Sequence, residues 1–369
     1  MNQLDRQSNF EFMRIVSMFF IVSWHVMVHG KIFAGLGDLS HLVESVLLGI
    51  IVVHVNSLVF VTGYFNGDKK SIHWRKVLKL VGVAWLYKAV IAFVFYKFHL
   101  AEFGKMTLME ELLPLDVNNN YWFVNVYLIL YIFSPYLNRV TENMDEKGFF
   151  HFLLLQLFFL SILPFISSHR FFSNDGSNII NFTLIYYLGS YFRKYPLKDN
   201  YHFRNLSMKS IRLILLILFF FFSFVNISFH ALGEMMSSIH YSVVQYCGNM
   251  ILRNYLLYSS LFVIIQSCAY CLLFETFSIR SKVINWIAGS TLGIYLIHDN
   301  HIMRVKLYEL LIPKMDSFGY SVLFHFIVVS IIIFISCFIV ESIRRVISKF
   351  VVLVYNKCLR KQKMVIGES

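Results

Sequence analysis

Charged residues are scarce in this chain, and their scarcity excludes an ordinary soluble domain. Only 15% of the 369 residues are charged, whereas 57% are hydrophobic. A soluble domain carries roughly 25% charged residues. The apolar residues here fall into repeated runs close to the roughly 20 residues that a helix needs to cross a bilayer. The sequence therefore predicts an all-α, polytopic integral membrane protein.

Proline is scarce as well, with five residues, and no alternation of polar and apolar residues recurs along the chain. A transmembrane β-barrel needs that alternation in segments of about ten residues, so the sequence disfavours a barrel. We predict about ten transmembrane helices instead. Their predicted ranges are 12–29, 42–64, 79–98, 120–137, 149–167, 179–192, 211–229, 255–274, 284–298 and 320–341.

The net charge of +12 does not indicate a nucleic-acid partner, because the Lys and Arg residues cluster in alternate short loops. That pattern follows the positive-inside rule of membrane proteins and predicts that both termini are cytosolic. We expect contact with membrane lipid and none with nucleic acid. Residues 1–345 are predicted to form one membrane-embedded domain, and residues 346–369 a basic cytosolic tail.

The first predicted span carries three ionisable residues, Arg14, His25 and His29. Such groups are costly inside a membrane and are usually kept for a function. Arg14 and His25 are eleven residues apart. This spacing puts them within roughly 20° of one helix face and about 16 Å apart along its axis. A cation near one membrane surface is thus aligned with an imidazole deep in the span.

The imidazole of His25 can take a proton from a hydroxyl or hold one for a leaving group, because it titrates near neutrality. His54 in the second predicted span extends a polar seam, although an intramembrane histidine can also simply bond to a neighbouring helix. His29 follows His25 at a spacing compatible with zinc. No carboxylate lies near it in the sequence, so we expect no metal.

Five cations follow the second predicted span, and three of them, Arg75, Lys76 and Lys79, lie in the segment WRKVLK at 74–79. Such loops anchor membrane proteins to anionic lipid, and clustered cations can also bind a polyphosphate group. We predict that these three bind a phosphate-bearing cofactor.

A polar motif, His298 to Asn300, ends the ninth predicted span. A His–Asp pair there could orient an imidazole or bind a sugar hydroxyl, and the motif could also cap a helix. Trp122 lies where an aromatic belt is expected, and it could also stack on a sugar. The predicted substrate-binding residues are His29, His54, Asn56, Trp122, His298, Asp299, Asn300 and Arg304.

Five phrases form an ordered series along the chain, namely Arg14 followed by ten residues and His25, VNSLVFVTGYF at 55–65, the Trp122–Phe123 pair with SPYLN at 134–138, YYLGSYFRKYP at 186–196, and GSTLGIYLIHDN at 289–300. In this order they resemble the integral-membrane acyltransferase family 3, bacterial enzymes that O-acylate carbohydrates, over nearly the whole chain. In the second phrase, Thr62 stands for the usual Ser. The family also often has two arginines separated by two residues after its second helix, where this chain has Lys76 and Lys79.

The resemblance implies an O-acetyltransferase of the bacterial cytoplasmic membrane. Its donor would be acetyl-CoA from the cytosol, and its acceptor a hydroxyl of a cell-surface polysaccharide or of a lipid-linked glycan precursor. The resemblance also implies that His25 and Arg14 are catalytic. His25 would act as a general base or carry the acyl group itself, and Arg14 would steer the donor or orient its neighbours. The sugar, its hydroxyl, the length of the acyl group and the oligomeric state stay open. The alternative is a polysaccharide exporter or flippase without transferase activity.

Overall fold

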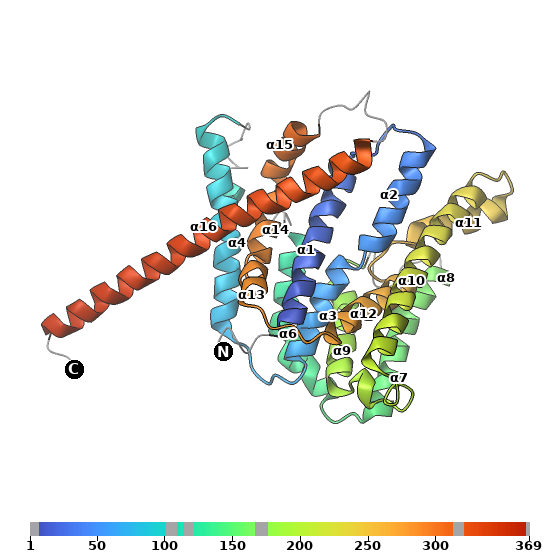
Figure 1. Ribbon diagram of the computed structural model, residues 1–369, viewed down its shortest axis with the longest axis horizontal. Coiled ribbons are helices and arrows are strands. Elements are labelled where there is room, and N and C mark those ends of the chain that lie inside the picture. The colour runs from blue at the N-terminus through green and yellow to red at the C-terminus, as the bar shows by residue number, and fades with distance from the viewer. Residues whose placement is uncertain are drawn as a thin grey trace.

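The chain folds into a bundle of helices, and no strand occurs in the part of the chain that the structure describes (Figure 1). The computed structural model describes residues 7–100, 109–111, 113, 121–166, 176–312 and 321–366. Six helical segments among these are long and apolar enough to cross a membrane, namely Ser8–Val28, Leu39–Asn66, Trp74–Lys97, Glu146–Phe165, Met208–Ser237 and Val322–Asn356. The predicted all-helical fold with several spans is confirmed. The number ten and the cytosolic termini stay predictions.

Each of the ten predicted spans overlaps helical residues that the structure describes, but residues 255–260 of the eighth lie outside a helix, since α12 (Leu261–Glu275) begins later. The second predicted span is broken. Span 42–64 divides into α2 (Asp38–Ile51) and α3 (His54–Asn66). At the break, Nδ1 of His54 lies 2.6 Å from the carbonyl oxygen of Ile51. A helix interrupted inside a membrane must satisfy its freed backbone groups internally, and this bond satisfies one of them.

The ninth predicted span is broken too. Span 284–298 divides into α13 (Lys282–Ala288) and α14 (Thr291–His298). A guanidinium nitrogen of Arg345 donates to the hydroxyl oxygen of Ser290 in this gap, at 2.6 Å. A hydropathy pattern contains no signal for either break, because apolar residues continue on both sides of it.

The remaining helices include two, at 242–254 and 301–311, that fall between predicted spans. In chain order, the remaining helices are α4 (Trp74–Lys97), α6 (Trp122–Thr141), α7 (Glu146–Leu157), the π-helix η1 (Phe158–Ile162), α8 (Leu163–Ile166), α9 (Ile179–Lys194), the 3₁₀-helix η2 (Leu197–Asp199), α10 (Met208–Ser237), α11 (Ser242–Asn254), α12 (Leu261–Glu275), α15 (His301–Leu311) and α16 (Ser321–Ile366).

Helix α1 (Ser8–Val28) lies at the centre of the bundle (Figure 1). It packs against α2, α3, α12, α13, α14 and α16. Val22 and Val26 are fully buried in these contacts. Near its start, the side-chain amide of Asn9 donates to the carbonyl oxygen of Phe274, at 3.0 Å. A helix enclosed on so many sides can present a polar side chain to the protein interior instead of to lipid, which suits its ionisable residues.

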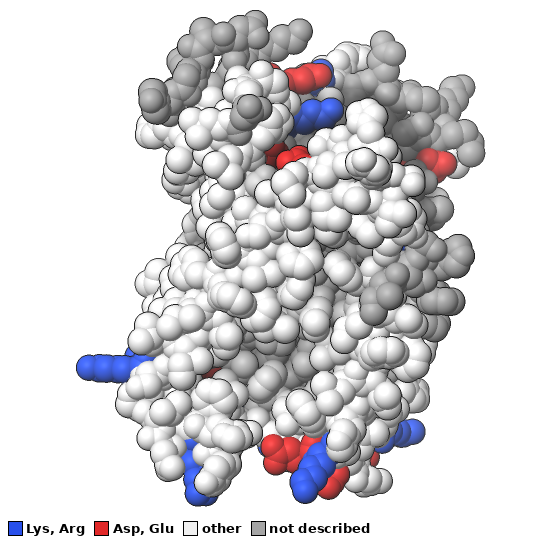
Figure 2. Space-filling model, turned by 90° about the vertical axis from the view of Figure 1, so that its right-hand side faces the viewer, with Lys and Arg blue, Asp and Glu red and all other residues white. Residues whose placement is uncertain are grey.

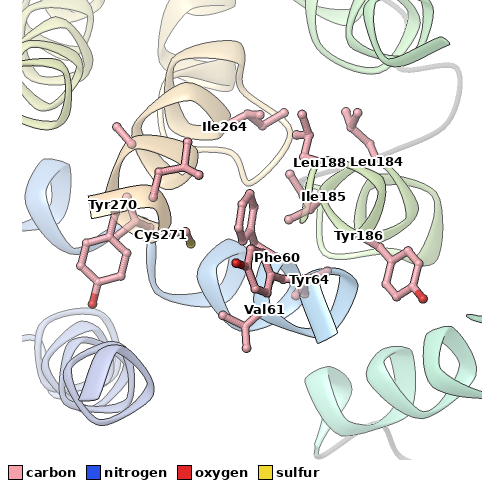
Figure 3. Packing of buried hydrophobic residues seen from close by; sticks show 14 of the residues in the cluster. Phe60, Val61, Tyr64, Leu184, Ile185, Tyr186, Leu188, Ile264, Tyr270 and Cys271 are labelled. Carbon is pink, nitrogen blue, oxygen red and sulfur yellow. The ribbon is translucent and has the colours of Figure 1, made fainter. Parts of the chain in front are cut away.

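Helices α3 and α9 approach each other closely because glycines lie at their contact. A Cβ atom on Gly63 would lie 1.9 Å from the carbonyl oxygen of Tyr186, and one on Gly189 would lie 2.0 Å from that of Phe60. Small residues permit such close packing of membrane helices. Figure 3 shows Phe60 and Tyr186 in the buried cluster that these helices share with α12. Both glycines belong to the phrases VNSLVFVTGYF and YYLGSYFRKYP.

Charged side chains lie near both ends of the face shown in Figure 2, and a broad band without them separates the two groups. This distribution suits a protein surrounded by lipid along its middle. Helix α16 runs without a break across residue 345, where the membrane domain was predicted to end, and its second half projects away from the bundle (Figure 1). The domain boundary stays a prediction.

Candidate active site

His25 is held by a second histidine at the end of α14. Its Nδ1 atom lies 3.0 Å from Nε2 of His298, and Nδ1 of His298 lies 2.7 Å from the carbonyl oxygen of Ile294. Because a carbonyl oxygen only accepts, Nδ1 of His298 carries the hydrogen, and Nε2 of a neutral His298 is an acceptor. Nδ1 of His25 therefore donates to His298. Nε2 of His25 is left with a lone pair that can take a proton.

A carboxylate lies beside the same edge of His25. Oδ1 of Asp299 is 3.4 Å from Nδ1 of His25, and the Asp299 side chain is 4% exposed. A guanidinium nitrogen of Arg304 donates to the same oxygen at 3.2 Å. A nearby carboxylate favours the charged form of an imidazole. His25 can thus accept a proton at Nε2 while Asp299 stabilises the resulting positive charge.

A cavity of about 520 Å³ opens beside His25 and is called the His25 cavity below. His25 lines it together with His29, His54 and Trp122, three of the predicted substrate-binding residues. The Nδ1 edge of His25 is turned to His298 and Asp299, so the Nε2 edge is the one available to the cavity. The fold therefore brings residues from α3, α6 and the C-terminal end of α1 to the His25 cavity.

Two of the predicted substrate-binding residues, Asn56 and Asn300, bond to backbone groups and do not line the His25 cavity. The side-chain amide of Asn56 donates to the carbonyl oxygen of Tyr258 at 2.9 Å. The side-chain oxygen of Asn300 accepts from two backbone N–H groups at the start of α15 and caps that helix. These bonds give both side chains a structural role, and the substrate contact predicted for them stays a prediction.

A second cavity of about 350 Å³ contains Arg14 and Lys76 and is called the Arg14 cavity below. Most of its other walls are apolar. Ile21, Phe123 and Tyr295 line both cavities, so the two adjoin at these side chains. Helix α1 thus lines both cavities, with Arg14 in the Arg14 cavity and His25 in the His25 cavity.

The predicted cofactor-binding cations separate in the structure. Lys76 lines the Arg14 cavity, where Arg14 itself pairs with Glu11 at 3.1 Å. Arg75 and Lys79 are exposed and lie outside the linings of both cavities. Of the three cations in this segment, only Lys76 is placed to meet a molecule in the Arg14 cavity.

The sequence matches a family model described as an acyltransferase domain over residues 7–342. The chain belongs to acyltransferase family 3. This confirms the resemblance seen in the five phrases. No curated protein and no solved structure matches the chain. The protein is thus a membrane acyltransferase, and the chemistry of its site can be considered as acyl transfer.

In this acyltransferase, the fold brings a carboxylate to His25 and His29, although none lies near them in the sequence. Ligand atoms of His25, His29 and Asp299 lie within 4.8 Å of one another, a spacing that could hold a metal ion. However, a guanidinium nitrogen of Arg304 lies 3.1 Å from Nε2 of His29 and 3.2 Å from Oδ1 of Asp299. Arg304 thus supplies a cation at this position, which disfavours a metal.

Sequence reasoning missed Tyr258, a central residue of the acyltransferase site. Nδ1 of His54 donates to a carbonyl, so its Nε2 accepts, and the hydroxyl of Tyr258 donates to it at 3.4 Å. The ring of Tyr258 also stacks on Trp122, with ring centroids 6.1 Å apart. A tyrosine just before an apolar helix resembles any membrane-interface tyrosine, so the sequence carried no signal for this role.

Proposed function

We propose that this membrane acyltransferase moves an acetyl group from cytosolic acetyl-CoA to a hydroxyl of a cell-surface polysaccharide or its lipid-linked precursor, in the bacterial cytoplasmic membrane. The supporting observation is the pair of adjoining cavities, one with cations and one with the free Nε2 of His25. Arg14 and Lys76 suit a phosphate-bearing donor. The apolar walls of the Arg14 cavity suit its uncharged arm, whose thioester would reach the partition at Ile21, Phe123 and Tyr295.

In the proposed reaction, His25 acts as a general base. Its Nε2 takes the proton of the acceptor hydroxyl while the hydroxyl oxygen attacks the carbonyl carbon of the thioester. The new C–O bond forms, the C–S bond breaks, and the imidazolium returns the proton to the departing thiolate. Asp299, 3.4 Å from Nδ1 of His25, stabilises the imidazolium in between.

The acceptor would occupy the His25 cavity. Its stacked rings of Trp122 and Tyr258 offer an apolar face to a sugar ring. His29 and His54 line the same cavity and add polar side chains to its walls. Small-molecule sites combine apolar walls with a few placed polar groups in this way. A carbohydrate fits these walls better than an extended apolar acceptor.

Analysis of the surface polysaccharide tests this function. Proton NMR of glycan from cells with and without the gene should show loss of acetyl esters, while the amount of exported glycan is unchanged. Reintroducing the wild-type gene should restore the esters. Glycan retained inside the cell, with esters unaffected, would instead identify an exporter or flippase.

A further inference from the structure

A third cavity, of about 340 Å³, lies between the loop after α3 and the ends of α6 and α9. It is called the Lys69 cavity below. Five cations and two carboxylates line it, which leaves a clear excess of positive charge. These residues are Lys69, Lys70, Arg139, Arg193, Lys194, Asp68 and Glu142.

The Lys69 cavity adjoins the Arg14 cavity. Asn66 lines the Arg14 cavity, and the next residue, Gly67, lines the Lys69 cavity. Nζ of Lys69 donates to the side-chain oxygen of Asn66 at 3.0 Å. Burial lowers the pKa of Lys69, the positive charge of Lys76 in the Arg14 cavity lowers it further, and the carboxylate of Asp68 offsets part of this effect. The two ammonium groups thus repel each other across the junction, and an anion bound there would relieve the repulsion.

The wall between the two cavities is rigid. The side-chain amide of Asn138 donates to the carbonyl oxygens of Asn66 and Lys69, at 2.7 and 2.8 Å. Its side-chain oxygen accepts from the hydroxyl of Tyr186 at 2.9 Å. A loop held in this way loses little entropy when a ligand binds, so the site is organised in advance.

Two arginines of the Lys69 cavity stack on aromatic rings. Arg139 lies over the ring of Tyr136 at 5.7 Å, and Arg193 over that of Tyr64 at 5.3 Å. Arg193 also donates to the hydroxyl of Tyr64, and a guanidinium has five N–H groups, so others are left for a phosphate. The Glu142 carboxylate is paired with Lys70, so it opposes an anion less than an isolated carboxylate would.

We propose that the Lys69 cavity binds the phosphorylated nucleotide end of a CoA-type thioester, while the pantetheine arm extends through the Arg14 cavity towards His25. This inference rests on the proposed function and names the donor contacts of the same site. The cavity volume lies within the roughly 300–1,000 Å³ usual for small-molecule sites. The nucleotide phosphates would then meet Arg139 and Arg193 rather than Arg75 and Lys79.

Comparing two acyl donors, with and without the nucleotide, tests this inference independently of the proposed function. Purified protein would be assayed with acetyl-CoA and with S-acetylpantetheine, which lacks the nucleotide. In the double variant Arg139→Gln, Arg193→Gln, we expect the KM for acetyl-CoA to rise about 10-fold with kcat unchanged, and the KM for S-acetylpantetheine to stay the same. The control is Arg204→Gln, since Arg204 also stacks on a tyrosine ring, that of Tyr201, but lies outside the cavity.

An unchanged KM for acetyl-CoA in the double variant would overturn the inference and leave the proposed function standing. If wild-type protein uses neither donor, the proposed function fails instead. Calorimetry distinguishes a nucleotide from a lipid phosphate. Adenosine 3′,5′-bisphosphate should bind wild-type protein and bind the double variant about 10-fold more weakly. Binding of phosphatidylglycerol vesicles alone, without the nucleotide, would assign the cations to lipid headgroups and contradict the inference.

Discussion

The His25 cavity and the Arg14 cavity lie side by side, yet they are built differently. In the His25 cavity, His298 and the carbonyl oxygen of Ile51 accept hydrogen bonds that determine which nitrogens of His25 and His54 carry a hydrogen. In the Arg14 cavity, most walls are apolar, and Arg14 and Lys76 add two cations to the lining. Proton transfer needs defined protonation states, whereas a flexible donor arm needs only a channel and an anchor for its charge. Changes in the first cavity should therefore lower kcat, and changes in the second should raise the KM of the donor.

Replacing the proposed base should have the largest effect. We expect His25→Ala to lower acetyl transfer by about 10²- to 10⁴-fold, the usual contribution of a general base. Transfer would be measured in membrane vesicles with labelled acetyl-CoA, at matched protein levels. The control is His41→Ala, since His41 is a largely exposed histidine on α2. Retained acetylation in the His25 variant would refute the proposed role of this residue.

Removing the partner of the base should have the next largest effect. In His298→Phe, Nδ1 of His25 loses its nearer acceptor and keeps only Oδ1 of Asp299 at 3.4 Å, so the tautomer with a free Nε2 is less strongly selected. We expect kcat to fall by roughly 10- to 100-fold with the KM of acetyl-CoA little changed. Steady-state kinetics of the purified protein, together with its thermal unfolding midpoint, checks this. A rise in KM with normal kcat would show that His298 serves donor binding instead.

A change of charge in the Arg14 cavity should act on the donor alone. We expect Lys76→Gln to raise the KM of acetyl-CoA by about 3- to 10-fold, because one charge-assisted contact is lost. Lys79→Gln provides a matched control on the same helix, outside the cavity linings. Both variants would be compared by initial rates over a range of acetyl-CoA concentrations. Equal effects of the two substitutions would contradict the assignment of this cavity to the donor.

Enlarging the partition should have the smallest effect. Phe123 lines both cavities, so Phe123→Ala would leave more room for a longer acyl group at the junction. We expect the preference for propionyl-CoA over acetyl-CoA to rise about 3-fold. This is below the roughly 10- to 200-fold discrimination that one methylene group can provide. Competition between the two donors, with mass analysis of the product, gives this ratio. The control is Phe133→Ala, since Phe133 is an exposed phenylalanine on the same helix. An equal shift of donor preference in this variant would contradict the prediction.

The local properties of α1 could be predicted from the sequence. Its apolar composition predicted a membrane helix, and the helical repeat predicted that Arg14 and His25 share a face. Both inferences depend only on neighbouring residues, so no tertiary information was needed. The glycines of α3 and α9 were recognisable only as parts of family phrases, since their physical reason is the close contact between the two helices.

The sequence by itself determined a helical membrane protein of the acyltransferase family with an ionisable first helix. Only the tertiary structure decided which groups surround His25. His298 is 273 residues away along the chain, and Tyr258 is 204 residues from His54. Contacts over such separations come from the packing of whole helices, and no residue spacing encodes them. The same packing divided the predicted phosphate-binding cations, because the position of each around α4 decides whether it faces a cavity or the surface.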